Sequence, residues 1–372
     1  MKLLARFAIL AALLALSSKA APFMAVGDNA ELFVTASAAV QSDSNIYLDK
    51  NNEKSDTIFS FTPGVDLVFG KGSATSGNAY FREEIRRYST NDVQNTNLAS
   101  FGVKTSYSNG VTKGDFNASY AEIAQNDNDI KATGDIVHRD LTNLGGKVEF
   151  GISEKTTLAV GASFDRINYG PATYVDSDIW TLPIDLYYQS SPKLDWSLGY
   201  QYRSTDLSGS ARDSKDHFLS LGARGEFSPE KLFGQVRVGY TKRSFDRGAD
   251  ESLFGVMGNL TYKYSDKTSY GLTFGNDFGS SGTGASTKNL TFGLNASNNF
   301  TEQWHMVASL NYKSTDYTTR TDDFVEGQVA VTYVYNNFVN FGASMTLRNN
   351  TSGLAAAEFS QNVFSLGANI RY

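Results

Sequence analysis

The chain closes on the stretch Phe359-Ser-Gln-Asn-Val-Phe-Ser-Leu-Gly-Ala-Asn-Ile-Arg-Tyr372. Counted back from Tyr372, every second residue up to Phe364 is apolar, whereas the residues between them are polar or small. Successive side chains of a β-strand point to opposite faces, so this alternation predicts a strand with one apolar and one polar face. The aromatic terminal residue is part of the pattern, and the predicted strand therefore runs to the last residue.

A half-buried strand of a soluble sandwich would show the same alternation, but such a strand rarely ends the chain in this way. The combination of Gly367, Ile370 and Tyr372 is similar to the carboxy-terminal signal that the barrel assembly machinery of Gram-negative bacteria reads on outer-membrane β-barrels. The resemblance implies that these three residues form an assembly signal. It also implies that the assembly machinery and outer-membrane lipid are partners of the chain.

The first residues have the layout of a secretory signal. Lys2 and Arg6 precede an apolar run over residues 7–16, and small residues lead up to Ala20. A membrane anchor needs about 20 apolar residues, so the run is too short for one. We expect residues 1–20 to be a signal peptide, and residues 21–372 to form one barrel that reaches the outer membrane after export through the inner membrane.

The composition agrees with a membrane barrel. The chain has 33 Gly, 20 Tyr and 25 Phe but only 6 Pro, and its mean hydropathy is slightly negative. A barrel combines low mean hydropathy with one apolar face because every second residue points into a polar lumen. The absence of Cys excludes disulfides, cysteine metal sites and a lipoprotein anchor, and the net charge of −6 argues against a nucleic-acid partner.

Short turns recur along the chain at nearly regular spacing, for example at residues 153–155, 191–193 and 229–231, and each is followed by an alternating strand. Longer polar stretches lie between these units, which is the asymmetry of bacterial barrels with short periplasmic turns and long outer loops. We predict an all-β, antiparallel, up-and-down transmembrane barrel of eighteen strands, with sixteen as the alternative. The predicted strands are 30–40, 56–69, 78–89, 97–108, 113–124, 141–152, 155–168, 179–190, 193–206, 216–227, 231–246, 252–265, 267–279, 287–299, 302–315, 323–336, 338–349 and 359–372.

The alternation assigns each side chain to lipid or lumen. In the strand 231–246, Val238 is assigned to lipid and Arg237 to the lumen; in the strand 267–279, Phe278 is assigned to lipid. The inward positions carry Gly, Ser, Thr, Asn and charges of both signs. The candidates for lining the pore are Arg82, Arg86, Arg203, Arg237, Arg243 and Lys313. The alternative is that these charges pair with carboxylates on neighbouring strands.

No motif predicts catalysis, a cofactor or a metal site. His217 beside Asp213 and Asp216 would be a hydrolytic dyad only with a nucleophile motif, and none is present. The sequence Asn126-Asp-Asn-Asp129 resembles calcium ligands without the full spacing of a calcium loop, and we expect it to be a solvated loop tip. We therefore expect that the protein is not an enzyme and has no cofactor.

Two strand ends share the pattern Tyr-x-x-Arg-Ser-x-Asp, ending at Asp206 and Asp246, and Lys313 takes the place of the arginine in a third. These ends, and Phe61-Thr-Pro-Gly-Val-Asp-Leu67, resemble the family of putative β-barrel porins, type 2. That family is often associated with exopolysaccharide export, so the resemblance implies a large outer-membrane barrel without a defined substrate. It also brings in polysaccharide secretion proteins as candidate partners.

Three functions follow from these observations. The first is a porin-like pore for small hydrophilic solutes, in which the inward arginines contact anionic or sugar solutes. The second is the barrel component of an exopolysaccharide export assembly. The third is a barrel enzyme or a structural surface protein.

Overall fold

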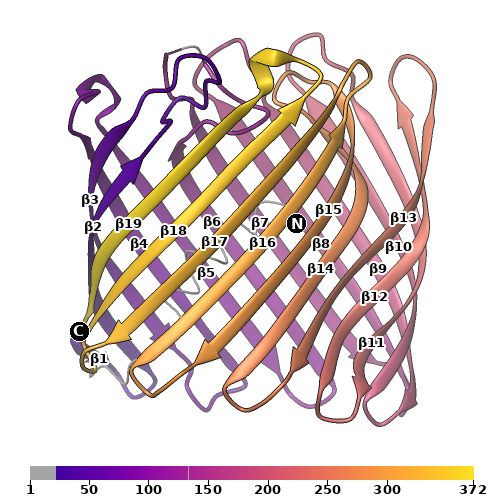
Figure 1. Ribbon diagram of the computed structural model, residues 1–372. Helices are drawn as coiled ribbons and strands as arrows, with labels where there is room; N and C mark the ends of the chain where they lie inside the picture. The colour runs from indigo at the N-terminus through magenta and orange to yellow at the C-terminus, as the bar shows by residue number, and fades with distance from the viewer. Residues whose placement is uncertain (1–21, 133) are drawn as a thin grey trace.

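In the computed structural model, which describes residues 22–132 and 134–372, eighteen long strands form one closed antiparallel barrel (Figure 1). Each strand pairs with the next along the chain, and the last strand, β19 (Phe359–Arg371), pairs with the first long strand, β2 (Ala30–Asp43). The predicted up-and-down barrel of eighteen strands is confirmed, and the alternative of sixteen is wrong. The predicted signal peptide, residues 1–20, lies outside the described residues.

The strands between these two follow the predicted ranges closely. They are β3 (Asp56–Phe69), β4 (Thr75–Tyr88), β5 (Thr96–Ser108), β6 (Thr112–Ala124), β7 (His138–Gly151), β8 (Thr156–Tyr169), β9 (Ser177–Ser191), β10 (Leu194–Leu207), β11 (Ser214–Ser228), β12 (Leu232–Phe245), β13 (Glu251–Lys263), β14 (Thr268–Ser280), β15 (Ser286–Asn299), β16 (Trp304–Asp316), β17 (Thr321–Val334) and β18 (Val339–Ser352). Short 3-10 helices lie at η1 (Asp92–Gln94) and η2 (Ala355–Ala357). The described residues contain no helix that is long and apolar enough to cross a membrane.

Closure depends on the ladder between β19 and β2, which runs from Val363 opposite Asp43 to Arg371 opposite Thr35. Tyr372 continues it: its N–H donates to the carbonyl of Val34 at 2.9 Å, and the N–H of Val34 donates back at 2.7 Å. The terminal residue is thus part of the closing ladder, as the alternation predicts. A strand that the sequence did not indicate, β1 (Met24–Val26), pairs with the first residues of β2.

A series of linked side-chain hydrogen bonds reinforces this seam near its outer end. Arg348 on β18 donates to Glu326 at 2.7 Å and to the amide oxygen of Gln361 at 3.1 Å. The amide nitrogen of Gln361 on β19 then donates to both carboxylate oxygens of Asp43 on β2, at 2.9 and 2.8 Å. Four neighbouring strands are therefore tied together across the point where the barrel closes.

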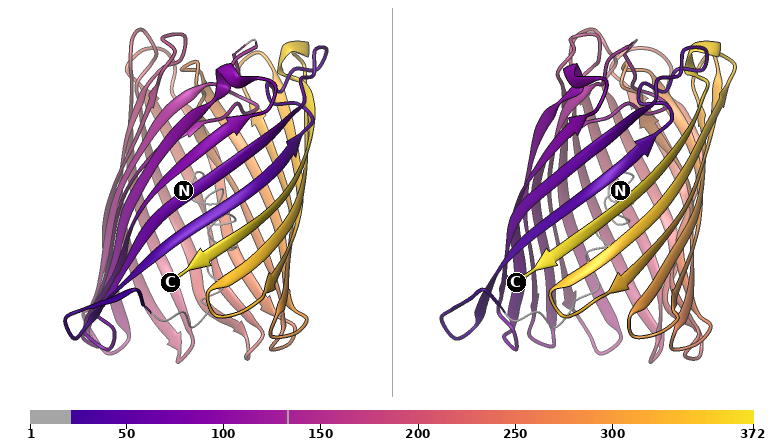
Figure 2. Two further views of the ribbon diagram at one scale, coloured as in Figure 1. Left: turned by 90° about the vertical axis from the view of Figure 1, so that its left-hand side faces the viewer. Right: turned by 60° about the vertical axis from the view of Figure 1, so that its left-hand side comes forward.

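The barrel has two unlike ends. The carboxy terminus lies toward the end with the short turns, and the longer connections gather at the other end (Figure 2). In a bacterial barrel the short turns face the periplasm and the longer loops face outward, so the outer end of this barrel carries the connections after β2, β6 and β8.

The predicted faces of β12 are confirmed. Val238 is 42% exposed on the outer surface, whereas the guanidinium of Arg237 points inward and donates to Asp185 at 2.9 Å. Large apolar side chains are exposed all around the outside, which is the lipid-facing band of a membrane barrel.

We predict that Gln361→Leu destabilises the closed barrel. The substitution leaves the buried carboxylate of Asp43 and the guanidinium of Arg348 each short of a partner, at a cost of about 1 to 3 kcal/mol. The measurement is the temperature at which the folded band on a gel converts to the unfolded band. Asn362→Leu is the matched control, because Asn362 is exposed on the other face of β19. Equal unfolding temperatures for both variants would contradict the proposal that these linked side-chain hydrogen bonds stabilise the closed barrel.

The register of β12 gives a second prediction. Val238→Arg should cost about 2 to 4 kcal/mol if it lies near the bilayer midplane. Arg237→Ser should also be destabilising, because it leaves the buried Asp185 unpaired, and removing one partner of a buried ion pair costs about 3 to 5 kcal/mol. Adding Asp185→Asn should restore stability to Arg237→Ser only, as measured by unfolding in urea. Rescue of Val238→Arg by the same change would show that the register is wrong.

Candidate functional site

Two small apolar clusters lie at the outer end of the barrel. One cluster joins Ile46 and Tyr47 of the β2–β3 connection to side chains at the outer ends of β3 to β6 and to the β6–β7 connection, and it consists of Ile46, Tyr47, Ile58, Tyr88, Leu98, Ala124 and Ile136. A second cluster joins Leu48 to Phe324 on β17 and Phe359 on β19. The connection 44–55 is therefore folded over the barrel opening and packs against the wall on both sides of the closing seam.

The β6–β7 connection reaches across the same opening. Asn126 donates to the carbonyl of Tyr47 at 3.3 Å, and Asp129 accepts from the Tyr317 hydroxyl at 2.6 Å and from the Gly282 N–H at 3.2 Å. Tyr317 follows β16, which lies on the opposite side of the ring from β7. The connection therefore spans the outer mouth and narrows it.

This placement corrects the expected solvated loop tip at 126–129. Asn126 and Asn128 are only 4% and 3% exposed, and the amide oxygen of Asn126 accepts from the Val137 N–H at 3.0 Å. Burial, followed by the nearby carboxylate of Asp127, raises the pKa of Asp129 above its ordinary value. Since the folded pKa is raised, burial of Asp129 costs least free energy at acid pH, and its cost grows as the pH rises toward that pKa, while the hydrogen bonds from Tyr317 and Gly282 favour the ionised carboxylate.

The first group of predicted pore residues forms a network at the outer end of the β10–β14 wall. Asp216 on β11 accepts from Arg203 at 2.7 Å and from Arg243 at 2.7 Å, and Arg203 also donates to Asp277 on β14 at 2.7 Å. Arg243 is only 1% exposed. The expectation that Arg243 lines the pore is therefore wrong, because its guanidinium is enclosed by protein and inaccessible to a solute.

The reason for this network is a break in the sheet. The ladder between β13 and β14 ends at Met257 opposite Gly275. Beyond it, Arg243 donates to the carbonyl of Gly279 at 2.8 Å and Arg203 donates to that of Phe278 at 3.2 Å. The arginines thus bond the backbone of β14 where β13 has separated from it.

Phe278 shows a second consequence of the break. It was assigned to lipid by alternation, but it is 1% exposed and lies under the guanidinium of Arg243, at 4.6 Å from the ring centroid. Its position follows from the separation of β13 and β14, which opens a space in the wall that a large ring fills.

A second network lies nearer the periplasmic end of the same wall. Arg237 bonds Asp185 and also donates to the Tyr187 hydroxyl at 2.9 Å. Arg224 stacks on the Tyr187 ring at 3.4 Å from its centroid and bonds Glu149 on β7 at 2.7 Å. Since β7 and β11 are separated by three strands, the side chains fill the bend of the wall between them.

The remaining candidates lie on other parts of the inner wall. Arg82 pairs with Asp66 at 2.6 Å, and Arg86 pairs with Glu84 at 3.0 Å. Lys313 lies on β16, close enough to Asp129 to lower the pKa of that carboxyl against the larger effect of burial. The five arginine candidates are thus all paired with carboxylates, which is the alternative that the sequence left open.

The histidine that was considered for a dyad has a different role. The Nδ1 atom of His217 lies 2.8 Å from the Tyr200 hydroxyl on the outward face of the barrel. Asp216 precedes it in β11 and points to the inward face, where it is buried by the two arginines. Neighbouring residues of a strand point to opposite faces, so the two side chains cannot act together.

Sequence reasoning missed Asp216 and Tyr187 as members of the inner networks. The strand alternation alone would have found Asp216, because it has the same parity as the inward residues Ser220 and Arg224 of β11. No local signal indicates that Tyr187 would lie between two arginines, since that contact joins β9 to β11 and β12.

Comparison with known proteins agrees with this geometry. Residues 199–372 match the family described as Putative beta-barrel porin 2, which confirms the resemblance over this part of the chain. No curated protein matches the chain. The crystal structure of Pseudomonas aeruginosa OccK2 (OpdF) in complex with glucuronate has a TM-score of 0.50 and 10% identity, over 92% of this chain and 98% of that chain.

Other solved structures are similar at the same level. Acinetobacter baumannii OccAB2 has a TM-score of 0.49 and 10% identity, over 93% of this chain and 98% of that chain. A BenF-like porin from Pseudomonas fluorescens Pf-5 has a TM-score of 0.49 and 10% identity, over 92% and 99%. At this identity the likeness concerns the fold alone.

We predict that releasing the β6–β7 connection widens the outer mouth. Asp129→Ala and Tyr317→Phe each remove the hydrogen bond that holds the connection to the opposite wall, so single-channel conductance in a planar bilayer should rise. Asp92→Ala is the control, because it removes an exposed carboxylate of another outer connection. Unchanged conductance in both variants would mean that this connection does not limit the pore.

Proposed function

The protein is a porin-like β-barrel of the Gram-negative outer membrane, and we propose that it is a pore for small hydrophilic solutes with weak charge selectivity. The observation that carries the proposal is the closed barrel with an inward face of Gly, Ser, Thr, Asn and ion pairs. A barrel of this strand number is wide enough to hold water as well as side chains.

The pairing of inward charges supports weak selectivity. Arg82 lies beside Asp66, Arg237 beside Asp185 and Arg348 beside Glu326, so the field of each cation is offset by an adjacent anion. A solute that passes such pairs meets alternating charges and no continuous line of bare cations. We therefore assign Arg82, Arg86, Arg203 and Arg237 to shaping the lumen and Lys313 to its wall.

The packed outer end supports passage of small solutes. The connections 44–55 and 125–137 both lie over the opening and are held by apolar contacts and hydrogen bonds. A glycan chain would need a wide continuous channel, and no observation favours the export assembly over the small-solute pore.

Two further assignments belong to this proposal. We assign Gly367, Ile370 and Tyr372 to recognition by the barrel assembly machinery; Ile370 and Tyr372 are exposed on the outside of the closing strand, where a partner can reach them. We also infer that the protein is not an enzyme, which the separation of His217 from Asp216 supports.

Reconstitution in a planar bilayer tests the function. The wild-type protein should give discrete conductance steps, and the reversal potential in a salt gradient should lie near zero. Arg82→Ser should shift the potential toward cation selectivity, because the carboxylate of Asp66 then keeps only its longer ion pair with Arg371 at 3.8 Å. A correctly folded barrel that conducts no ions under any voltage would disprove the proposed pore.

A further inference from the structure

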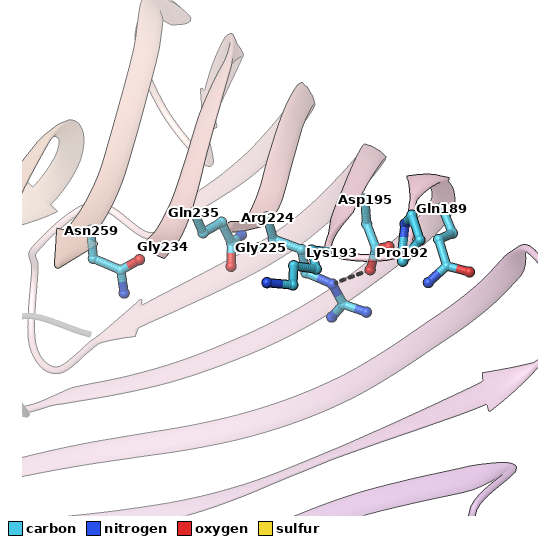
Figure 3. Close-up of a pocket in the computed structure, with 9 residues that line it drawn as sticks. All are labelled: Gln189, Pro192, Lys193, Asp195, Arg224, Gly225, Gly234, Gln235 and Asn259. Atoms are coloured by element: carbon cyan, nitrogen blue, oxygen red, sulfur yellow. Dashed lines mark hydrogen bonds and ion pairs between the residues drawn. The ribbon is translucent and has the colours of Figure 1, made fainter. Parts of the chain in front are cut away.

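A hollow lies in the inner wall of β9 to β13 at the periplasmic end of the barrel (Figure 3). Its volume is about 460 Å³, within the range of about 300 to 1,000 Å³ that is typical of small-molecule sites. The lining residues are Gln189, Pro192, Lys193, Asp195, Arg224, Gly225, Gly234, Gln235 and Asn259.

The floor of the hollow is a pair of glycines that no other residue can replace without rearrangement. Gly225 and Gly234 lie opposite each other in β11 and β12, with φ of +127° and +150°. A Cβ at Gly225 would lie 2.1 Å from the carbonyl oxygen of Lys193, and one at Gly234 would lie 2.0 Å from that of Asn259. The backbone conformation of the wall therefore keeps the floor free of side chains.

Side-chain amides surround this floor. Among the described residues, the side-chain amides of Gln189 and Asn259 have no hydrogen-bond partner, and both line the hollow (Figure 3). The amide oxygen of Gln235 accepts from Arg237 at 2.9 Å, so its NH₂ group is left to donate. Each amide offers a donor beside an acceptor in a fixed arrangement, except that Gln235 offers donors only.

The positive and negative side-chain charges around the hollow are equal in number. Lys193 pairs with Glu226 at 2.8 Å, and Arg224 pairs with Asp195 at 3.1 Å as well as with Glu149. Lys147 pairs with Glu149 at 2.6 Å, so three cations face three carboxylates. Stacking on Tyr187 also fixes the guanidinium of Arg224 in place. An ionic solute would have to compete with these pairs, whereas a neutral one would not.

We propose that this hollow is a binding site for a neutral saccharide. Sugar hydroxyls both donate and accept, which matches the free amides of Gln189 and Asn259 on either side of the glycine floor. If the site binds solutes on their way through the lumen, that role rests on the proposed pore function. The binding of a saccharide to the site does not depend on it.

Calorimetric titration of the folded barrel in detergent tests the site without requiring conduction. Maltose and glucose are the neutral probes, and gluconate is a charged probe of similar chemistry. Wild type should bind a neutral probe, and the double variant Gln189→Ala with Asn259→Ala should weaken binding about tenfold. Gln328→Ala is the control, because it removes an inward amide of β17 on another part of the wall.

The outcomes separate the site from the pore. Failure of both neutral probes to bind, tighter binding of gluconate, or an equal loss in Gln328→Ala would overturn the saccharide site. Bilayer recordings on the same samples report on conduction independently. If the protein conducts ions but binds no sugar, the proposed pore stands and the proposed saccharide site is disproved. If it binds sugar through Gln189 and Asn259 but does not conduct, the saccharide site stands and the proposed pore is disproved.

Discussion

The hydrogen-bond requirement of the backbone in lipid governs this structure. A peptide group in the hydrocarbon region has no water to bond, so a sheet can cross the bilayer only when every edge is paired. The ladder between β19 and β2 meets this requirement, and Tyr372 takes part in it through its own backbone. The linked side-chain hydrogen bonds from Glu326 to Asp43 reinforce the ladder where the barrel closes.

The same requirement explains the arginines at the strand ends. Where β13 separates from β14, the carbonyls of Phe278 and Gly279 accept from Arg203 and Arg243. Asp216 lies between the two guanidinium groups, and Asp277 supplies the second carboxylate that offsets their charge. The arginine of the strand-end motif was expected to contact solutes. At Arg243 it instead bonds the backbone of β14 and so links neighbouring strands of the wall.

The two ends of the barrel are built differently, with consequences for transport. At the outer end, the connections 44–55 and 125–137 bring apolar residues over the opening. At the periplasmic end, the paired glycines Gly225 and Gly234 leave a hollow in the wall. A solute would thus meet an entrance narrowed by packed connections first and a polar hollow with unpaired amides afterwards.

The sequence by itself determined the fold class, and it predicted eighteen strands, against an alternative of sixteen, and the two faces of strands such as β12. These properties follow from side-chain alternation, which is local and repeats every two residues. Alternation failed at Phe278, where a break between two strands changed what lay beside the ring. Only the tertiary structure decided which charges pair, since Arg224 meets Glu149 across three intervening strands. It also decided that Asp129 binds the opposite wall, because contacts across a lumen depend on the curvature of the whole barrel and leave no periodic signal in the chain.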